Sequence, residues 1–453
     1  MSAPPVRDPA SAAARRREQR GWYWYDWANS VFTTSVVTVF LGPYLSDVAE
    51  TAAGGSGDGG GTLHPLGIPV SPDSLFPYLL SVSALLQVLV LPVVGAVADR
   101  TRRKRELMGV FAYAGALATA ALALVSGGRY LLGSALFLVA NVCFGASIVV
   151  YYSFLPEIAG PDERDAVSSR GWAFGYLGGG LLLALNLGLF LNADDLELTE
   201  GQAVRICFLS VAIWWAGFTL VPLARLRDRP RTDGAPAASA AGSFRQLAAT
   251  LRSLRAYPQT LLFLAAYLLF NDGIQTVIGL SAQYGDRELE LSQTVLISTI
   301  LLVQFVAFGG ALLLGRIAAR AGAKRTVLGS LVVWVVVLCL AFFLQRGSAV
   351  QFYVLGAAIG LVLGGTQALT RSLFAQMTPR GKEAEYFGLY EISDKGTSWL
   401  GTLTFGLAVQ LTDSYRVAII SLVVFFVAGG LLLARVDVRR AVADARGERP
   451  AVL

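Results

Sequence analysis

The chain has 453 residues, of which 55% are hydrophobic and only 15% are charged, and its formal net charge is +6. So few charged residues in so long a chain exclude an ordinary soluble domain and favour a protein that spans a lipid bilayer. Cys143, Cys207 and Cys339 all fall in apolar stretches, so we interpret them as packing residues and expect no disulfide and no metal site.

Twelve apolar stretches follow one another along the chain. A helix of about 20 apolar residues crosses a bilayer core of roughly 30 Å, and lipid offers no partner for the open backbone of other structures. We therefore predict an all-α membrane protein with twelve transmembrane helices. The predicted spans are 22–45, 74–98, 106–126, 130–155, 171–191, 203–224, 259–282, 293–318, 326–345, 349–370, 386–411 and 415–434.

The basic residues fall almost entirely on one side of this arrangement. With the N-terminus in the cytoplasm, 31 of the 37 Lys and Arg residues lie in the tails and inner loops. Cytoplasmic loops carry such an excess, so we expect both termini in the cytoplasm and the protein in the plasma (inner) membrane. The positive charge therefore indicates topology, and no nucleic-acid partner is expected. Trp22, Tyr23, Trp24 and Tyr25 are interpreted as an interfacial aromatic belt.

A polar segment between the sixth and seventh spans divides the chain into two halves. Residues 232–243 are rich in Ala, Gly, Ser and Pro and are typical of a flexible linker. A capping box at Ser243 then precedes a one-sided apolar pattern from Phe244 to Leu254, which indicates either a helix on the inner membrane surface or a linker helix packed on the bundle. The expected domains are a cytoplasmic basic tail (1–20), an N-terminal six-helix bundle (21–225), a cytoplasmic linker with a short interfacial helix (226–258), a C-terminal six-helix bundle (259–435) and a cytoplasmic tail (436–453).

The two halves share a faint repeat. Gly95-x-x-x-Asp99-Arg100-x-x-x-Lys104-Arg105 follows the second span, and Gly315-x-x-x-Ala319-Arg320-x-x-x-Lys324-Arg325 follows the eighth span at the same spacing. A parallel repeat of six plus six spans is one of the ways in which transporters are built. The repeat therefore points to a transporter.

The first copy resembles the loop signature of the major facilitator superfamily, Gly-x-x-x-Asp-Arg-x-Gly-Arg-Arg/Lys. Gly95, Asp99, Arg100 and Arg103 match it, whereas Arg102 stands where the signature has Gly. The resemblance implies two pseudo-symmetric six-helix bundles and a cytoplasmic gate, in which Asp99 caps a nearby helix end and joins ion pairs that hold the cytoplasmic side shut. Its possible partners are Arg100, Arg103, Glu157, Arg164 and Arg170. Topology alone also explains the basic run.

Four further segments are similar to the autophagy-related vacuole effluxer-like branch of this superfamily. They are Trp24–Ser30, Phe270–Gly273, Gly365–Ser372 and Phe387–Lys395. Fungal members of that branch are associated with the export of amino acids from the vacuole. The resemblance therefore implies a transporter, with amino acids as cargo and export as direction.

Polar and charged residues inside the spans are the candidate substrate-binding or proton-coupling residues, because they are costly in lipid unless they face a protein or water-filled interior. Several recur at helical spacing, as Asp26 and Asn29 do in the first span and Gln367 and Arg371 in the tenth. The candidates are Asp26, Asn29, Asn271, Asp272, Gln275, Gln367, Arg371, Glu391, Asp394 and Lys395.

Several candidates also have a structural interpretation. Asp26 and Arg371 could be solvated charges near the inner ends of their helices, and Glu391 with Lys395 could be an i,i+4 ion pair. Asp272 is the strongest candidate, because it is deep and no Lys or Arg lies within one helical turn of it. The proton affinity of a carboxylate depends on burial and on nearby cations, so we expect Asp272, Asp26 or Glu391 to exchange a proton during transport.

These features together predict a secondary active transporter that moves a small polar solute by alternating access, as a monomer and without cofactor or metal. We find no ATP-binding phosphate loop, no cluster with metal-ligand spacing and no nucleophilic triad, so we expect no enzymatic activity and no catalytic residue. Two alternatives stay open, namely a carrier of sugars, glycosides or drug-like solutes and a membrane sensor that transports nothing.

Overall fold

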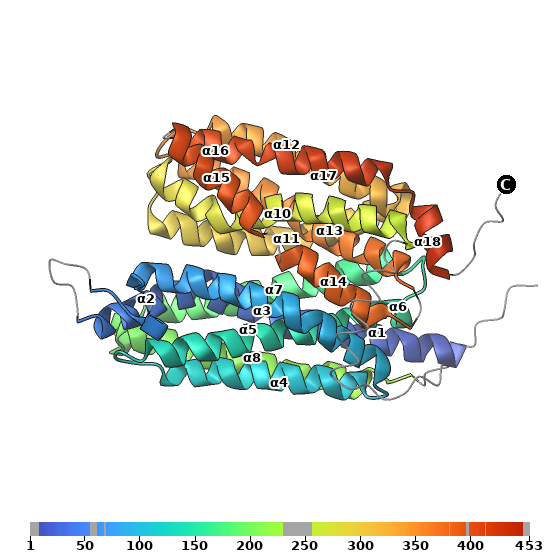
Figure 1. Ribbon diagram of the computed structural model, residues 1–453, viewed down its shortest axis with the longest axis horizontal. Coiled ribbons are helices and arrows are strands. Elements are labelled where there is room, and N and C mark those ends of the chain that lie inside the picture. Colours follow the sequence, from blue (N-terminus) through green and yellow to red (C-terminus); the bar gives the residue numbers. More distant parts are fainter. Residues whose placement is uncertain are drawn as a thin grey trace, which may run out of the picture.

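The structure is a computed structural model that describes residues 9–54, 61–67, 69–229, 256–379, 381–395, 398–412 and 414–446. The described residues form long helices joined by short loops, and the two halves of the chain lie against each other as two groups (Figure 1). Buried hydrophobic residues of both halves make up one core. The predicted linker helix, 244–254, lies outside the described residues.

The first half begins with a helix that continues across three segments. α1 (Pro9–Val31) leads into a π-helical segment, η1 (Phe32–Phe40), and then into α2 (Leu41–Ala52). A π-helical segment inside a helix is uncommon and often marks a functional position. The remaining helices of this half are α3 (Pro72–Arg100), α4 (Lys104–Ala121), α5 (Tyr130–Ser153), α6 (Leu155–Ile158), α7 (Arg164–Leu191) and α8 (Glu200–Arg225).

The second half repeats the pattern of long helices, and the described helices of its last part are shorter. Its helices are α10 (Pro258–Arg287), α11 (Gln293–Ala321), α12 (Ala323–Phe342), α13 (Ala349–Met377), α14 (Glu383–Lys395), α15 (Ser398–Thr412), α16 (Tyr415–Ser421), α17 (Val423–Arg435) and α18 (Val438–Arg446). Within the predicted C-terminal tail, α18 packs against α10 and α13 and buries Ala441 and Ala445.

Local sequence signals fix several helix ends. Thr199 and Gln202 form a capping box at the start of α8, and prolines open α3 and α10, where a missing backbone N–H costs nothing. Gly322, with a φ of +87°, makes the sharp turn between α11 and α12. A residue with a Cβ would be strained at this φ, so the glycine allows these two helices to follow one another directly.

The prediction of an all-α membrane protein is confirmed, with one difference in its spans. Eleven stretches of the described helices are long and apolar enough to cross a membrane, and the first runs from Ala12 to Ala52, well beyond the predicted 22–45. Residues 9–20, which the sequence assigned to a cytoplasmic tail, therefore form the first part of α1. Within the predicted span 386–411 the structure describes α14 and α15, and residues 396–397 between them lie outside the described residues. With 13 and 15 residues, neither described helix is long enough by itself to be counted as a span.

Close helix contacts in the interior depend on small residues of α7. A Cβ at Gly175 would lie 2.6 Å from Ser30 Oγ, and one at Gly178 would lie 2.7 Å from the Trp27 carbonyl oxygen. Neither position has room for a side chain, so α7 can lie directly on α1. This contact sets α1 and α7 side by side along the boundary with the second half.

Candidate functional site

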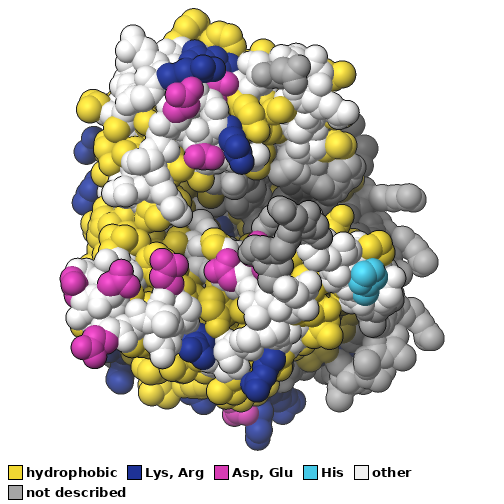
Figure 2. Space-filling view, turned by 90° about the vertical axis from the view of Figure 1, so that its left-hand side faces the viewer, with side chains coloured by type: hydrophobic (Ala, Val, Ile, Leu, Met, Phe, Trp, Pro, Cys, Tyr) yellow, Lys and Arg dark blue, Asp and Glu magenta, His cyan; other side chains and the backbone are white. Residues whose placement is uncertain are grey.

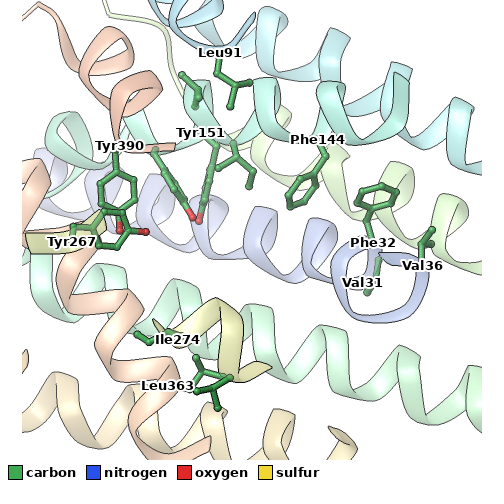
Figure 3. Packing of buried hydrophobic residues seen from close by; sticks show 14 of the residues in the cluster. Val31, Phe32, Val36, Leu91, Phe144, Tyr151, Tyr267, Ile274, Leu363 and Tyr390 are labelled. Atoms are coloured by element: carbon green, nitrogen blue, oxygen red, sulfur yellow. The ribbon is translucent and has the colours of Figure 1, made fainter. Parts of the chain in front are cut away.

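A cavity of about 310 Å³ lies between the two halves. Its walls come from α1, η1, α5 and α7 of the first half and from α10, α11, α12, α13, α14 and α16 of the second half. Aromatic rings and uncharged polar side chains make up much of the lining. Tyr267 of α10 and Tyr390 of α14 stack in its wall with ring centroids 4.3 Å apart (Figure 3).

Arg371 of α13 lies beneath this cavity with a relative exposure of 0%. Its guanidinium enters the first half, where it donates to the Oγ and the carbonyl oxygen of Ser168, each at 2.9 Å. Two of its nitrogens also lie 3.3 Å from Oδ2 of Asp26, which is itself 5% exposed. The sequence allowed Asp26 and Arg371 to be solvated charges near helix ends. The structure excludes this, because both side chains are buried and pair with each other.

Aromatic rings enclose this buried cation. The Arg371 guanidinium carbon lies 4.7 Å from the Trp22 ring centroid, 4.8 Å from that of Tyr152 and 5.4 Å from that of Trp172. Such cation–π contacts replace part of the hydration that a buried guanidinium has lost. Trp22 is fully buried here, so interpreting it as part of an interfacial belt was wrong. Its partner is a cation that stands far away in the sequence.

Helical spacing places the side chains that surround Arg371 on two helix faces. Trp22 and Asp26 stand four residues apart on α1, and Ser168 and Trp172 stand four residues apart on α7, so each pair shares one helix face. Because α7 packs on α1, the two faces meet and form a receptor for the Arg371 side chain. The i,i+4 spacing was visible in the sequence, but nothing in it indicated which cation the faces receive.

The other sequence-predicted candidates fall into three groups. Asn29, Gln275, Gln367 and Glu391 line the cavity together with Asp26, and Gln367 Oε1 accepts a hydrogen bond from the Tyr176 hydroxyl at 2.6 Å. A second group, Asn271 and Asp272, is buried in the packing of α10 and does not line the cavity. The side chains of Asp394 and Lys395 lie outside the described part of the structure.

The end of the molecule that holds Asp99, Lys104, Glu157, Arg229 and the start of α14 is called the basic end below. Oδ1 and Oδ2 of Asp99 accept the backbone N–H groups of Ala384 (2.9 Å) and Glu385 (2.8 Å) in the first turn of α14. A carboxylate at this position satisfies orphan N–H groups and complements the positive end of the helix dipole. A side chain at Gly95 would collide with the Ala384 backbone, so the glycine lets α3 approach α14.

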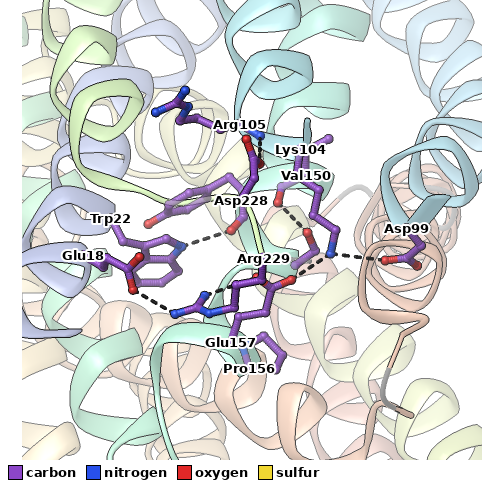
Figure 4. Close-up of polar contacts among 12 residues, drawn as sticks. Glu18, Trp22, Asp99, Lys104, Arg105, Val150, Pro156, Glu157, Asp228 and Arg229 are labelled. Atoms are coloured by element: carbon purple, nitrogen blue, oxygen red, sulfur yellow. Dashed lines mark hydrogen bonds and ion pairs between the residues drawn. The ribbon is translucent and has the colours of Figure 1, made fainter. Parts of the chain in front are cut away.

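Ion pairs extend from Asp99 along the basic end (Figure 4). Lys104 Nζ lies 3.5 Å from Asp99 Oδ1 and 2.8 Å from Glu157 Oε1. Arg229 joins Glu157 (3.3 Å) to Glu18 (2.8 Å). The possible partners named from the sequence omitted Lys104 and Arg229, although Lys104 belongs to the loop motif itself.

The other charged gate candidates, Arg100 and Arg103, form no ion pair with Asp99 among the described residues. Arg103 pairs with Glu106 on the exposed surface, and Arg100 makes no ion pair within the described part of the chain. Arg164 donates to the carbonyl oxygen of Ala375 at 3.1 Å, so it also crosses between the halves. Of the possible partners expected for Asp99, Glu157 is joined to it through Lys104, whereas Arg103 and Arg164 make their contacts elsewhere.

A further contact between the halves involves an acid outside both copies of the loop motif. Asp165 of α7 accepts from the Ser372 hydroxyl at 2.5 Å and from the Gln376 amide at 3.4 Å, both on α13. Among the described residues, the hydrogen bonds that join the two halves lie between the level of Tyr176 and the basic end. The cavity is therefore closed toward the basic end. The opposite end carries scattered acidic side chains (Figure 2).

Comparisons with known proteins agree with this architecture. The family model described as "Vacuole effluxer Atg22 like" matches residues 14–166 and 161–446. An uncharacterized MFS-type transporter of Bacillus subtilis, YxiO, is 28% identical over 422 residues, covering 92% of this chain and 94% of the relative. Autophagy-related protein 22-1 of Penicillium rubens is 27% identical over an alignment of 546 positions, covering 95% of this chain and 91% of the relative.

Two solved structures share the fold. The human organic anion transporter MFSD10 (TETRAN) has a TM-score of 0.71 at 15% identity, covering 95% of this chain and 100% of that one. FucP, a major facilitator transporter in the outward conformation, has a TM-score of 0.64 at 10% identity, covering 93% of this chain and 98% of that one. The predicted major facilitator fold is confirmed. At these identities the likeness concerns the fold alone.

Proposed function

Since the chain belongs to the vacuole effluxer Atg22-like family of major facilitator transporters, we propose that it moves a small polar solute by alternating access, coupled to a proton gradient. The observation that carries this proposal is the burial of Arg371, from the second half, against Asp26 and Ser168 of the first half beneath the cavity. The two halves cannot separate at the basic end without withdrawing this side chain. The pair therefore couples the state of the cavity to the state of the gate.

The proposed coupling follows from the electrostatics of that pair. A buried carboxylate and guanidinium stabilise each other, whereas either one alone in a low-dielectric interior is strongly unfavourable. When the halves separate and Arg371 leaves, a proton can replace the guanidinium as the counter-charge of Asp26. Asp26 also lines the cavity, so a bound solute can influence this exchange. Glu391, which lines the same cavity, is a second candidate for proton exchange.

The direction in the membrane is proposed from the charge pattern. We place the basic end in the cytoplasm of the cell, with both termini there and the protein in the plasma membrane, because Lys and Arg concentrate at this end. The segments 21–225 and 259–435 are proposed to move as the two rigid bundles. The closed basic end then corresponds to a state that faces outward.

Export is the proposed direction, because the matching family is described by its vacuole effluxers. Amino acids are the proposed cargo, because the chain resembles a branch whose fungal members are associated with their export. A neutral polyhydroxylated solute such as a sugar is a second candidate on one specific observation. Many described lining residues are amides and hydroxyls, among them Asn29, Thr33, Gln275, Gln304 and Gln367, and aromatic rings lie beside them. Such a lining can bind a solute that has no charge.

A flux assay with the purified chain in liposomes tests the proposal. Pooled amino acids, peptides and sugars are offered under an imposed proton gradient, and uptake is compared between the unaltered chain and Asp26→Asn. We expect concentrative uptake of at least one pool, which Asp26→Asn should lose. Binding of a solute without any flux would instead favour a membrane sensor. Uptake that ignores the proton gradient would remove proton coupling but not transport.

A further inference from the structure

Behind the cavity wall, one face of α10 carries two buried polar side chains whose oxygens lack partners. Asp272 and Thr276 are each 1% exposed. Among the described residues, Oδ1 of Asp272 and Oγ1 of Thr276 have no hydrogen-bond partner. The two residues stand one helical turn apart and so share a face, which lies against Gly401 of α15. Two unpartnered oxygens in one buried contact are costly unless something binds them.

The Thr276 hydroxyl, like that of Thr260, differs from those of the other buried threonines among the described residues. Those of Thr299, Thr366 and Thr370 donate to the carbonyl oxygen four residues earlier, at 2.7, 2.6 and 2.7 Å. This back-bonding is the common way for a helical threonine to satisfy its hydroxyl. Thr276 does not use it, so its Oγ1 presents lone pairs to the contact with α15.

The charge of Asp272 also needs a partner. Oδ2 accepts the Gly401 backbone N–H at 2.8 Å, and within the described part of the chain no Lys or Arg forms an ion pair with this carboxylate. An isolated ionised carboxylate inside a protein is strongly unfavourable. A proton on Oδ1 would neutralise the charge but would leave the Thr276 hydroxyl unpartnered. A cation held between Oδ1 and Oγ1 would satisfy both oxygens.

We propose that Asp272 and Thr276 form a binding site for Na⁺. Carboxylate and hydroxyl oxygens are the ligands that hard cations prefer, and one carboxylate balances one positive charge. Gly401 supports the site because its backbone can approach closely, whereas a Cβ there would collide with Thr276 Oγ1. Gln275, the chain neighbour of Thr276, lines the cavity, so α10 carries both the proposed ion site and part of the solute site. The site is separate from the Asp26–Arg371 pair.

Thermal unfolding of the purified full-length chain in detergent tests ion binding without any transport. Tm is measured against NaCl, KCl and choline chloride at constant ionic strength and pH, and a bound ion raises Tm in a saturable way. We expect Na⁺ alone to do so. Asp272→Asn should abolish the effect, and Thr276→Val should weaken Na⁺ binding by about tenfold or more. Thr276→Ser, which keeps the hydroxyl, should still show the Na⁺-dependent rise in Tm.

Thr260→Val is the matched control, because Thr260 is also fully buried on α10 with an unpartnered Oγ1. It should lower Tm equally in all salts and leave the Na⁺ response intact. The proposal is overturned if the unaltered chain shows no Na⁺-specific shift, or if Thr276→Val responds to Na⁺ as Thr276→Ser does. A stability that depends on pH but not on Na⁺ would assign the site to a proton instead. If Asp272→Asn fails to fold, the difference in Na⁺ response between Thr276→Val and Thr276→Ser still tests whether the site exists.

A flux measurement extends the inference and rests on the proposed transport function. At equal pH on both sides of the liposome, an inward Na⁺ gradient should accelerate solute uptake in the unaltered chain and in Thr260→Val, but not in Thr276→Val. Absence of flux under all conditions would contradict the proposed function, while the Tm series would still decide whether the Na⁺ site exists. Flux that proceeds equally in Na⁺ and K⁺ would count against a coupling role.

Discussion

Asp26 and Arg371 are separated by 345 positions in the sequence and lie 3.3 Å apart beneath the central cavity. Each comes from a different half, and each lies in surroundings that would not tolerate it alone. The pair is therefore both a structural contact and a conformational restraint. Its loss should be visible in stability and in transport.

Arg371→Ala should destabilise the protein by about 3–5 kcal/mol, because it leaves Asp26 buried without its cation. Asp26→Asn combined with Arg371→Met should be less destabilising than Arg371→Ala alone, since both charges are then removed. Thermal or denaturant unfolding in detergent measures this. A double variant as unstable as the sum of its single variants would show that the two residues do not interact.

Arg371→Lys should also impair transport although it keeps the charge. The planar guanidinium donates to Ser168 and Asp26 together, and it lies against the Trp22 ring. A lysine ammonium cannot reproduce this arrangement. Initial flux rates in liposomes should fall while the total amount of inserted protein stays constant. Normal flux in this variant would indicate that charge alone is sufficient.

Asp99→Ala should weaken the state in which the basic end is closed. It removes the acceptor of two α14 backbone N–H groups, a loss of about 0.5–2 kcal/mol for a helix cap. Cysteines introduced on the cavity side of α14 should then react faster with a reagent added from the basic end. Arg103→Ala is the control, because within the described part of the chain Arg103 pairs only with Glu106, on the exposed surface, and its loss should change nothing.

Asp272→Asn should abolish gradient-driven accumulation while solute exchange continues. The amide oxygen can still accept the Gly401 N–H, so the packing of α15 on α10 is kept while the negative charge is lost. Counterflow and net uptake, measured in the same liposome preparation, separate the two activities. Unchanged accumulation would remove Asp272 from any coupling role. Loss of both activities would indicate a structural role only.

Gly178→Ala should lower stability by about 1–3 kcal/mol, because its Cβ would lie 2.7 Å from the Trp27 carbonyl oxygen and force α7 away from α1. Gly217→Ala on α8 is the matched control, since a Cβ there meets nothing within 4 Å. We expect its Tm to stay the same or to rise slightly, as alanine favours helix. Equal Tm values for both variants would show that α7 can move without cost.

The sequence by itself determined the membrane class and most span positions, since runs of apolar residues are local patterns. It also identified Asp26, Arg371 and Asp272 as charges that need an explanation. It could not reveal that Asp26 and Arg371 meet, that Trp22 faces a cation, or that Asp272 faces α15 and not the cavity.

Only the tertiary structure decided those partners, for a physical reason. Helical spacing defines which residues share a face, but which helix covers that face depends on how small residues such as Gly175 and Gly178 let helices approach. The contacts of α14 and α15 are a similar case. Asp99 accepts the Ala384 N–H and Asp272 accepts the Gly401 N–H, and each contact joins residues more than a hundred positions apart, which no local pattern can indicate.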